Sequence, residues 1–116
     1  MTYQATAEDA QGNTWDVTGE TTFSIAAGAG GSWSDNVYTG EVAGDWTVTG
    51  EYAGLSDMAL LHVVHEVAVS VEITPDPATV TAGGSVTYQA TAEDAHGNTW
   101  DVTGETTFSK IGRAHV

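Results

Sequence analysis

Two stretches of this chain are nearly identical. Residues 2–24 return as residues 87–109, 85 positions later, and the only difference is Gln11 in the first copy against His96 in the second. A period of 85 residues is too long for the unit of a solenoid and suits one small β-domain. We therefore expect the chain to be a window cut from a tandem array of near-identical domains.

Both ends of this window look accidental. Met1 stands where the second copy has Val86, so we expect that it is not a native start. After Ser109 the repeat gives way to residues 110–116, whose sequence resembles a translated sequencing adapter. We interpret 110–116 as a non-native tail and leave them out of the fold prediction. A genuine divergent C-terminus is the alternative.

The amino-acid composition limits the classes of molecule that this chain can bind. Lys110 and Arg113 are the only Lys or Arg residues, so residues 1–109 carry sixteen carboxylates and neither basic type. Such a surface repels nucleic acid and anionic lipid, because phosphate binding requires cations, and it suits a salt-adapted prokaryotic source. The chain has no cysteine. No apolar run approaches the roughly 20 residues that span a bilayer, so we expect no membrane insertion.

The pattern of apolar residues predicts strands. Residues 69–74 alternate apolar and polar side chains, which indicates a half-buried strand. Two prolines then end this strand, because neither can donate to a ladder, and residues 78–81 resume extended structure before a Gly-Gly turn. Alternate residues of 86–92, and of 3–7 in the first copy, predict the next inward face.

The rest of the pattern is also typical of strands. Residues 9–13 and their twins 94–98 predict tight turns, with glycine supplying a positive φ. Residues 45–52 alternate apolar and polar side chains, and residues 58–65 are apolar on both faces, which predicts a strand covered on both sides. About seven short strands in one period, with no amphipathic helix, predict an all-β sandwich.

These segments resemble a known family. Residues 69–98 contain a hydrophobic strand, a Thr-Pro-Asp-Pro kink, an Ala-Gly-Gly turn, an alternating strand and Asp-Ala-His-Gly-Asn. This order resembles the opening half of bacterial immunoglobulin-like repeats, the modules of invasin- and intimin-type adhesins. Residues 44–52 and 62–64 look like later strands of the same module. The resemblance implies an immunoglobulin-like β-sandwich of about seven antiparallel strands per repeat.

The resemblance also implies the domain boundaries. Residues 2–68 form an immunoglobulin-like repeat that lacks its first strand, and 69–109 form the opening strands of the next, truncated repeat. Residues 66–68 are too short to let the later opening strand fold back onto the first domain, since a six-residue strand spans about 20 Å. We therefore expect strand-swapped self-association of the chain.

Oxygen-bearing side chains of the repeat are the first candidates for a metal site. They are Asp9, Asn13 and Asp16, with their twins Asp94, Asn98 and Asp101. Their spacing does not fit the EF-hand calcium loop, so we favour turns in which these side chains bond the local backbone. Calcium at a junction between domains, bound by Glu66, Glu72 or Asp76, is a second alternative. We assign no metal, cofactor or catalytic residue.

Histidine and tryptophan give weaker signals. His62 and His65 lie on opposite faces of a strand, His96 replaces a glutamine, and His115 is in the tail, so we expect no histidine metal site. Three tryptophans occupy positions expected to be core: Trp15, Trp46 and Trp100. Trp33 follows a glycine loop and is the one candidate for an exposed, sugar-stacking platform.

No serine has the setting of a nucleophile and no glycine cluster has phosphate-loop spacing, so we expect no enzyme. The leading hypothesis is a structural and adhesive module at the cell surface, or outside the cell, of a prokaryote. Its partners would be neighbouring immunoglobulin-like repeats that together form a stalk. An accessory domain of a secreted carbohydrate-active enzyme, as a spacer or glycan binder, is the alternative. A surface-layer lattice protein is a third.

Overall fold

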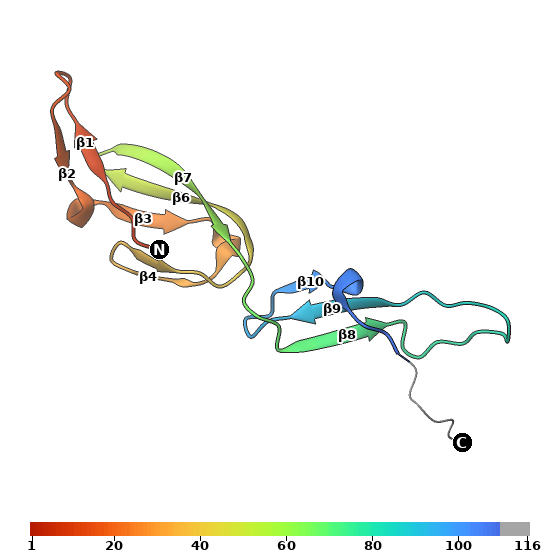
Figure 1. Cartoon of the computed structure of the whole chain (residues 1–116). Coiled ribbons are helices and arrows are strands. Elements are labelled where there is room, and N and C mark those ends of the chain that lie inside the picture. The colour runs from red at the N-terminus through yellow and green to blue at the C-terminus, as the bar shows by residue number, and fades with distance from the viewer. Residues whose placement is uncertain (110–116) are drawn as a thin grey trace. The chain divides into compact units, whose positions relative to one another are not determined.

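The structure is a computed structural model, and it describes residues 1–109. The chain is all-β with antiparallel sheets, as the sequence predicts. It divides into two compact units, Met1–His65 (unit 1) and Glu66–Val116 (unit 2), whose elements are labelled in Figure 1. None of the described residues belongs to a helix long and apolar enough to cross a bilayer.

Unit 1 holds three antiparallel sheets. Their strands are β1 (Thr6–Glu8) with β2 (Thr14–Asp16), β4 (Ser32–Ser34) with β5 (Val37–Thr39), and β3 (Thr22–Ile25) with β6 (Gly44–Tyr52) and β7 (Leu55–Val63). Two 3₁₀ turns connect them, η1 (Thr18–Glu20) and η2 (Ala27–Ala29). The longest pairing is the β6–β7 hairpin, whose two-residue turn has positive φ at both Ala53 and Gly54, as a twisted hairpin requires.

An aromatic cluster lies at the centre of unit 1. Tyr38 on β5 is only 2% exposed, and its hydroxyl donates to the Gly30 carbonyl at 2.6 Å. The Trp33 ring lies 5.1 Å from the Tyr38 ring and stacks on Phe23 at 5.8 Å, between ring centroids. Val48 on β6 is equally buried. These side chains come from different sheets, so the cluster joins the strands into one unit.

Unit 2 is a single three-stranded sheet in the order β10-β9-β8. Its strands are β8 (Ser70–Thr74), β9 (Gln89–Glu93) and β10 (Thr99–Asp101), followed by the 3₁₀ turn η3 (Thr103–Glu105). The alternating pattern of β8 therefore does form a strand. It is not half-buried as predicted: Val71 and Ile73 are 59% and 45% exposed, because the described part of unit 2, residues 66–109, has no second sheet to cover them.

The repeated sequence is also a repeated structure. β1, β2 and η1 recur 85 positions later as β9, β10 and η3. Val17 N donates to Ala5 O at 2.8 Å, and its twin Val102 N donates to Ala90 O at 2.8 Å. The copies part after this point, because β3 pairs with β6 in unit 1 and the described residues 107–109 have no such partner.

Two predictions about strands are wrong. Residues 78–81 form no strand, because no described segment of unit 2 pairs with them. The Gly-Gly turn after them is present, with Gly83 at a φ of +88°. The strand over 58–65 was predicted to be covered on both faces. β7 pairs with β6 alone, and Met58 and Leu60 are exposed, because nothing in unit 1 packs on that face.

Candidate functional site

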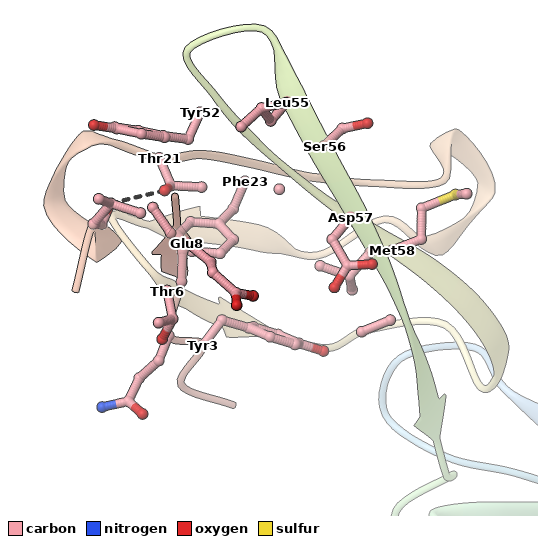
Figure 2. A pocket seen from close by; sticks show the side chains of 17 residues that line it. Tyr3, Thr6, Glu8, Thr21, Phe23, Tyr52, Leu55, Ser56, Asp57 and Met58 are labelled. Atoms are coloured by element: carbon pink, nitrogen blue, oxygen red, sulfur yellow. Dashed lines mark hydrogen bonds between the residues drawn. The ribbon is translucent and has the colours of Figure 1, made fainter. Parts of the chain in front are cut away.

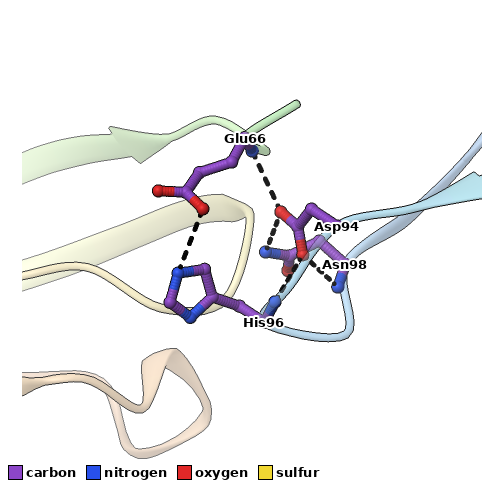
Figure 3. Close-up of polar contacts among 4 residues, drawn as sticks. All are labelled: Glu66, Asp94, His96 and Asn98. Atoms are coloured by element: carbon purple, nitrogen blue, oxygen red, sulfur yellow. Dashed lines mark hydrogen bonds and ion pairs between the residues drawn. The ribbon is translucent and has the colours of Figure 1, made fainter. Parts of the chain in front are cut away.

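Among the residues that the structure describes, the carboxylate of Asp94 is both buried and bonded by four hydrogen-bond donors. It lies one residue after β9 and is 2% exposed. Its Oδ1 accepts the backbone N–H groups of His96 and Asn98, each at 2.9 Å. Its Oδ2 accepts the Asn98 side-chain amide and the Glu66 backbone N–H, each also at 2.9 Å (Figure 3). The carboxylate therefore fastens its own turn and also the first residue of unit 2.

Local sequence explains how this turn forms. Gly97 has a φ of +85°, which an L side chain rarely adopts, and its N–H donates to Asp94 O at 3.2 Å. Asn98 closes the loop, because its backbone carbonyl accepts the Asp94 N–H at 3.0 Å. The segment Asp-x-x-Gly-Asn thus folds as the sequence predicts, with short polar side chains bonded to the backbone of a turn.

The hydrogen bonds also set the ionisation of this carboxyl. Burial acts to raise the pKa of Asp94, but the bonds donated by the Asn98 side chain and by the Glu66, Asn98 and His96 backbones outweigh it. The pKa therefore lies well below its ordinary value. Asp94 is therefore ionised in the folded chain at neutral pH.

The twin turn in unit 1 has the same internal bonds. Asp9 accepts the Gln11 and Asn13 backbone N–H groups and the Asn13 side-chain amide, each at 2.9 Å. These bonds, led by that of the Asn13 side chain, lower the pKa of Asp9. No residue in 1–109 supplies Asp9 with the bond that Glu66 gives Asp94, and Asp9 is exposed.

Asp16 and its twin Asp101 also accept hydrogen bonds from nearby residues of their own repeat. Asp101 Oδ1 accepts the Thr103 hydroxyl at 2.6 Å, and Asp16 Oδ1 accepts that of Thr18 at the same distance. The Thr103 hydroxyl in turn accepts the Ala90 N–H at 2.9 Å, which joins η3 to β9. Among the described residues no three His, Cys, Asp or Glu side chains are placed to hold a metal ion. The hydrogen bonds of these side chains are those that the turn interpretation predicts.

Histidines enter two polar pairs that the sequence did not indicate. His96 Nε2 lies 3.3 Å from Glu66 Oε2, beside the Asp94 turn, with both side chains well exposed (Figure 3). His62 Nδ1 contacts Asp45 Oδ1 across the β6–β7 pair. Both are surface pairs, which contribute about 0–1 kcal/mol each. His115 lies outside the described residues.

Tryptophan positions differ from the prediction. Trp33, expected as an exposed platform, packs instead against Tyr38 and Phe23, and its Nε1 is buried with no hydrogen-bond partner in residues 1–109. Trp15, expected in the core, is 45% exposed because nothing described covers its side of β2. Trp46 is half-buried, and its Nε1 donates to Val42 O at 2.9 Å.

A groove of about 260 Å³ opens in unit 1 beside β1. Thr6 and Glu8 lie on one side of it, and Asp57 and Met58 of β7 lie on the other (Figure 2). Its lining is mostly apolar and includes Ala5, Ala7, Phe23, Val48 and Leu55. The groove therefore separates β1 from the β3–β6–β7 sheet. The sequence does not predict this groove, because the groove depends on which strands lack a neighbour.

Comparison of the chain with protein-family models, with curated proteins and with solved structures finds no match. Three features of the molecule bear on its function: the 85-residue repeat that rebuilds the same hairpin, the Asp94 turn that fastens Glu66, and the groove beside β1.

Proposed function

We propose that the chain belongs to a tandem array of immunoglobulin-like β-sandwich repeats, which forms a stalk or spacer in an extracellular or cell-surface protein of a prokaryote. One observation carries this proposal: an 85-residue sequence repeat rebuilds the same hairpin and 3₁₀ turn with the same pairing. A period of one small domain that restores the same local structure is what a string of domains requires.

The sandwich part of the proposal is supported by the sides of the groove in unit 1. Ala7 on β1 and Val17 after β2 are buried, and both line the same groove as Val48 on β6. Two antiparallel sheets that direct apolar side chains into one interior are the basis of a β-sandwich. The bacterial immunoglobulin-like family is our choice because the sequence resemblance is to that architecture.

The stalk part of the proposal is supported by the Asp94 turn. β7 ends at Val63, and Glu66 is already bonded to Asp94. Only Val64 and His65 lie between the end of β7 and this fixed residue. Two residues have little conformational freedom, so a junction of this kind limits bending between consecutive repeats. The module would act through spacing and stiffness and not through catalysis.

Scattering from concatemers tests this role. Residues 25–109 contain one full period and can be joined head to tail in two, four and six copies. A stalk should lengthen in proportion to copy number, by about 30–40 Å per repeat, when the maximum dimension is measured by small-angle X-ray scattering. Growth with the square root of copy number would contradict the proposal. A matched series with Asp94→Ala in every repeat should bend more than the unsubstituted series.

The alternative is a glycan-binding accessory domain of a secreted carbohydrate-active enzyme. The exposure of Trp15 favours it, because an exposed ring on a strand can stack on a sugar. Affinity electrophoresis through soluble polysaccharides distinguishes the two functions. Retardation that Trp15→Ala abolishes would favour the accessory domain, and unchanged mobility in every polysaccharide would favour the stalk.

A further inference from the structure

We infer that the open edge of β1 in unit 1 is a docking site for residues 66–74 of a second copy of this chain. In unit 2 the segment is already seen on an identical strand: β8 pairs with β9, and β9 has the same sequence as residues 4–8. The equivalent strand of unit 1 is β1, which pairs with β2 alone among the described strands. The same edge is therefore filled in one unit and open in the other.

Hydrogen-bond direction shows which backbone groups are open. Val102 N donates to Ala90 O, and Asp94 N donates to Asn98 O, so alternate residues of β9 face β10. The residues between them, 89, 91 and 93, therefore face β8. The same bonds from Val17 N to Ala5 O and from Asp9 N to Asn13 O occur in unit 1. The backbones of residues 4, 6 and 8 thus face the open edge.

The register follows from the pairing in unit 2. Ser70 lies opposite Glu93, Glu72 opposite Thr91 and Thr74 opposite Gln89. Moved onto β1, the same strand would place Ser70, Glu72 and Thr74 opposite Glu8, Thr6 and Gln4. Val71 and Ile73 would then lie opposite Ala7 and Ala5, which line the groove.

The driving force is apolar burial. Transfer of β8 from β9 to β1 exchanges one set of ladder bonds for an equal set, because the two strands have the same sequence. Val71 and Ile73 are more than two-fifths exposed in unit 2, where the residues that the structure describes form a single sheet. On β1 they would enter the 260 Å³ groove against Phe23 and Leu55. Removal of these apolar side chains from water favours the docked state.

The turn next to β1 offers the matching polar bond. Asp94 Oδ2 accepts the Glu66 N–H from outside its turn, whereas every group in residues 1–109 that donates to the Asp9 carboxylate belongs to the Asp9 turn itself. A docked second copy would place its own Glu66 N–H on Asp9, as in unit 2. Three interactions thus favour residues 66–74 as the occupant: backbone hydrogen bonds to β1, burial of Val71 and Ile73 in the groove, and the bond from the Glu66 N–H to Asp9.

The occupant has to come from another molecule. On β7 the groove is lined by residues 55–59, and β7 ends at Val63. The end of the groove at residue 59 therefore lies four residues before Val63, which is about 13 Å along the strand. Three residue steps lead from Val63 to Glu66 and span at most about 10 Å. A segment from a second copy has no such restriction. Copies that both give and accept a segment form closed dimers or open chains.

Two variants of the full chain test the site. Val71→Asp with Ile73→Asp damages the donor segment, and Thr6→Pro removes a backbone N–H from the acceptor edge without removing a bond to β2. Sedimentation equilibrium in about 0.5 M NaCl, which screens the repulsion between acidic copies, should show association of the unsubstituted chain. Each variant alone should weaken association at least tenfold. Val80→Asp with Val86→Asp, the same chemical change outside the segment, should leave association unchanged.

Mixing the two variants gives the decisive result. The donor-damaged chain keeps its acceptor and the Thr6→Pro chain keeps its donor, so an equimolar mixture should form 1:1 heterodimers and nothing larger. Absence of heterodimers, or a Val80→Asp, Val86→Asp control that fails to associate, would overturn the inference. Amide-exchange protection of Asp9 and Val17, which bond across the hairpin, reports whether Thr6→Pro has kept its fold.

Cysteine pairs test the register without disturbing the edge, since the chain has no cysteine of its own. Thr6→Cys with Glu72→Cys should form intermolecular disulfides on mild oxidation. Thr6→Cys with Thr74→Cys, two residues out of register, should form far fewer, because such diagonal pairs lie about 7–8 Å apart. Equal yields would contradict the register. These results do not depend on the stalk proposal, which the scattering series tests separately.

Discussion

The two copies of the repeat show how much of the fold is local. Residues 2–24 and 87–109 build the same hairpin, the same Asp–Asn turn and the same 3₁₀ turn, although their surroundings differ. Asp94 is 2% exposed where Asp9 is exposed, and this difference comes from Glu66, which lies outside the repeat. The repeat thus encodes the geometry of the hairpin, whereas the burial of Asp94 depends on Glu66, a residue of the same chain that lies outside the repeat.

The copies differ further at their C-terminal ends. In unit 1 Phe23 lies on β3, paired with β6, and stacks on Trp33. In unit 2 its twin Phe108 meets Tyr88, as Phe23 meets Tyr3, but it lies in no strand and is exposed. The same residues therefore form a strand only where β6 provides a ladder and a packing surface.

The largest expected effect is on the aromatic cluster that only unit 1 possesses. Tyr38→Ala should lower the stability of unit 1 by about 3–5 kcal/mol, because it removes a buried ring at the centre of the cluster. Amide exchange should show loss of protection in β6 and none in β9. Equal losses in the two units would mean that they do not fold independently.

The next effect compares the twin turns directly. Asp94→Ala should remove four hydrogen bonds, including that of Glu66, and Asp9→Ala should remove three. We expect unit 2 to melt several degrees lower with Asp94→Ala, and unit 1 to change less with Asp9→Ala, because the Asp9 turn is exposed. Loss of exchange protection at the Glu66 amide should accompany only the first substitution. Equal melting shifts would show that burial of the turn is unimportant.

Acid should act on the same turn. The pKa of Asp94 is lowered in the folded chain, so its ionised form contributes stability above the unfolded pKa of about 3.9. That contribution is lost as the pH falls from about 5 towards the lowered pKa. The protection factor of the Glu66 amide should therefore be constant above about pH 5 and should fall in acid. Asp94→Asn, which has no charge to lose, should flatten this part of the profile.

The smallest effect concerns the one residue that differs between the copies. His96→Gln restores the residue of the first copy and removes the exposed pair with Glu66. We expect a change of less than about 1 kcal/mol in the stability of unit 2, measured by urea unfolding. Gln11→His provides the matched control in unit 1. A larger loss at His96 would mean that this pair also holds the turn.

The sequence predicts the all-β class and the turns well, because alternation, glycine and the Asp–Asn pairs are local signals. It predicts the alternating strand at 69–74 but not its exposure, which arises because residues 66–109 form one sheet with no second sheet against it. It places Trp33 at the surface, because a glycine loop gives no sign that Tyr38 and Phe23 will surround it. The sequence also does not predict the bond from Glu66 to Asp94, since a backbone N–H donor leaves no pattern of side chains.

The spacing of β8 and β9 along the chain has a consequence for synthesis. About 15 positions separate Thr74 from Gln89, so a ribosome adding roughly 5–20 residues per second exposes β8 about one to three seconds before the strand it pairs with in unit 2. During that interval β9 of the same chain does not yet exist. The edges available to β8 that have the sequence of β9 are the β1 edges of nascent chains on neighbouring ribosomes. Crowded translation therefore favours exchange between molecules, and slower initiation should reduce it.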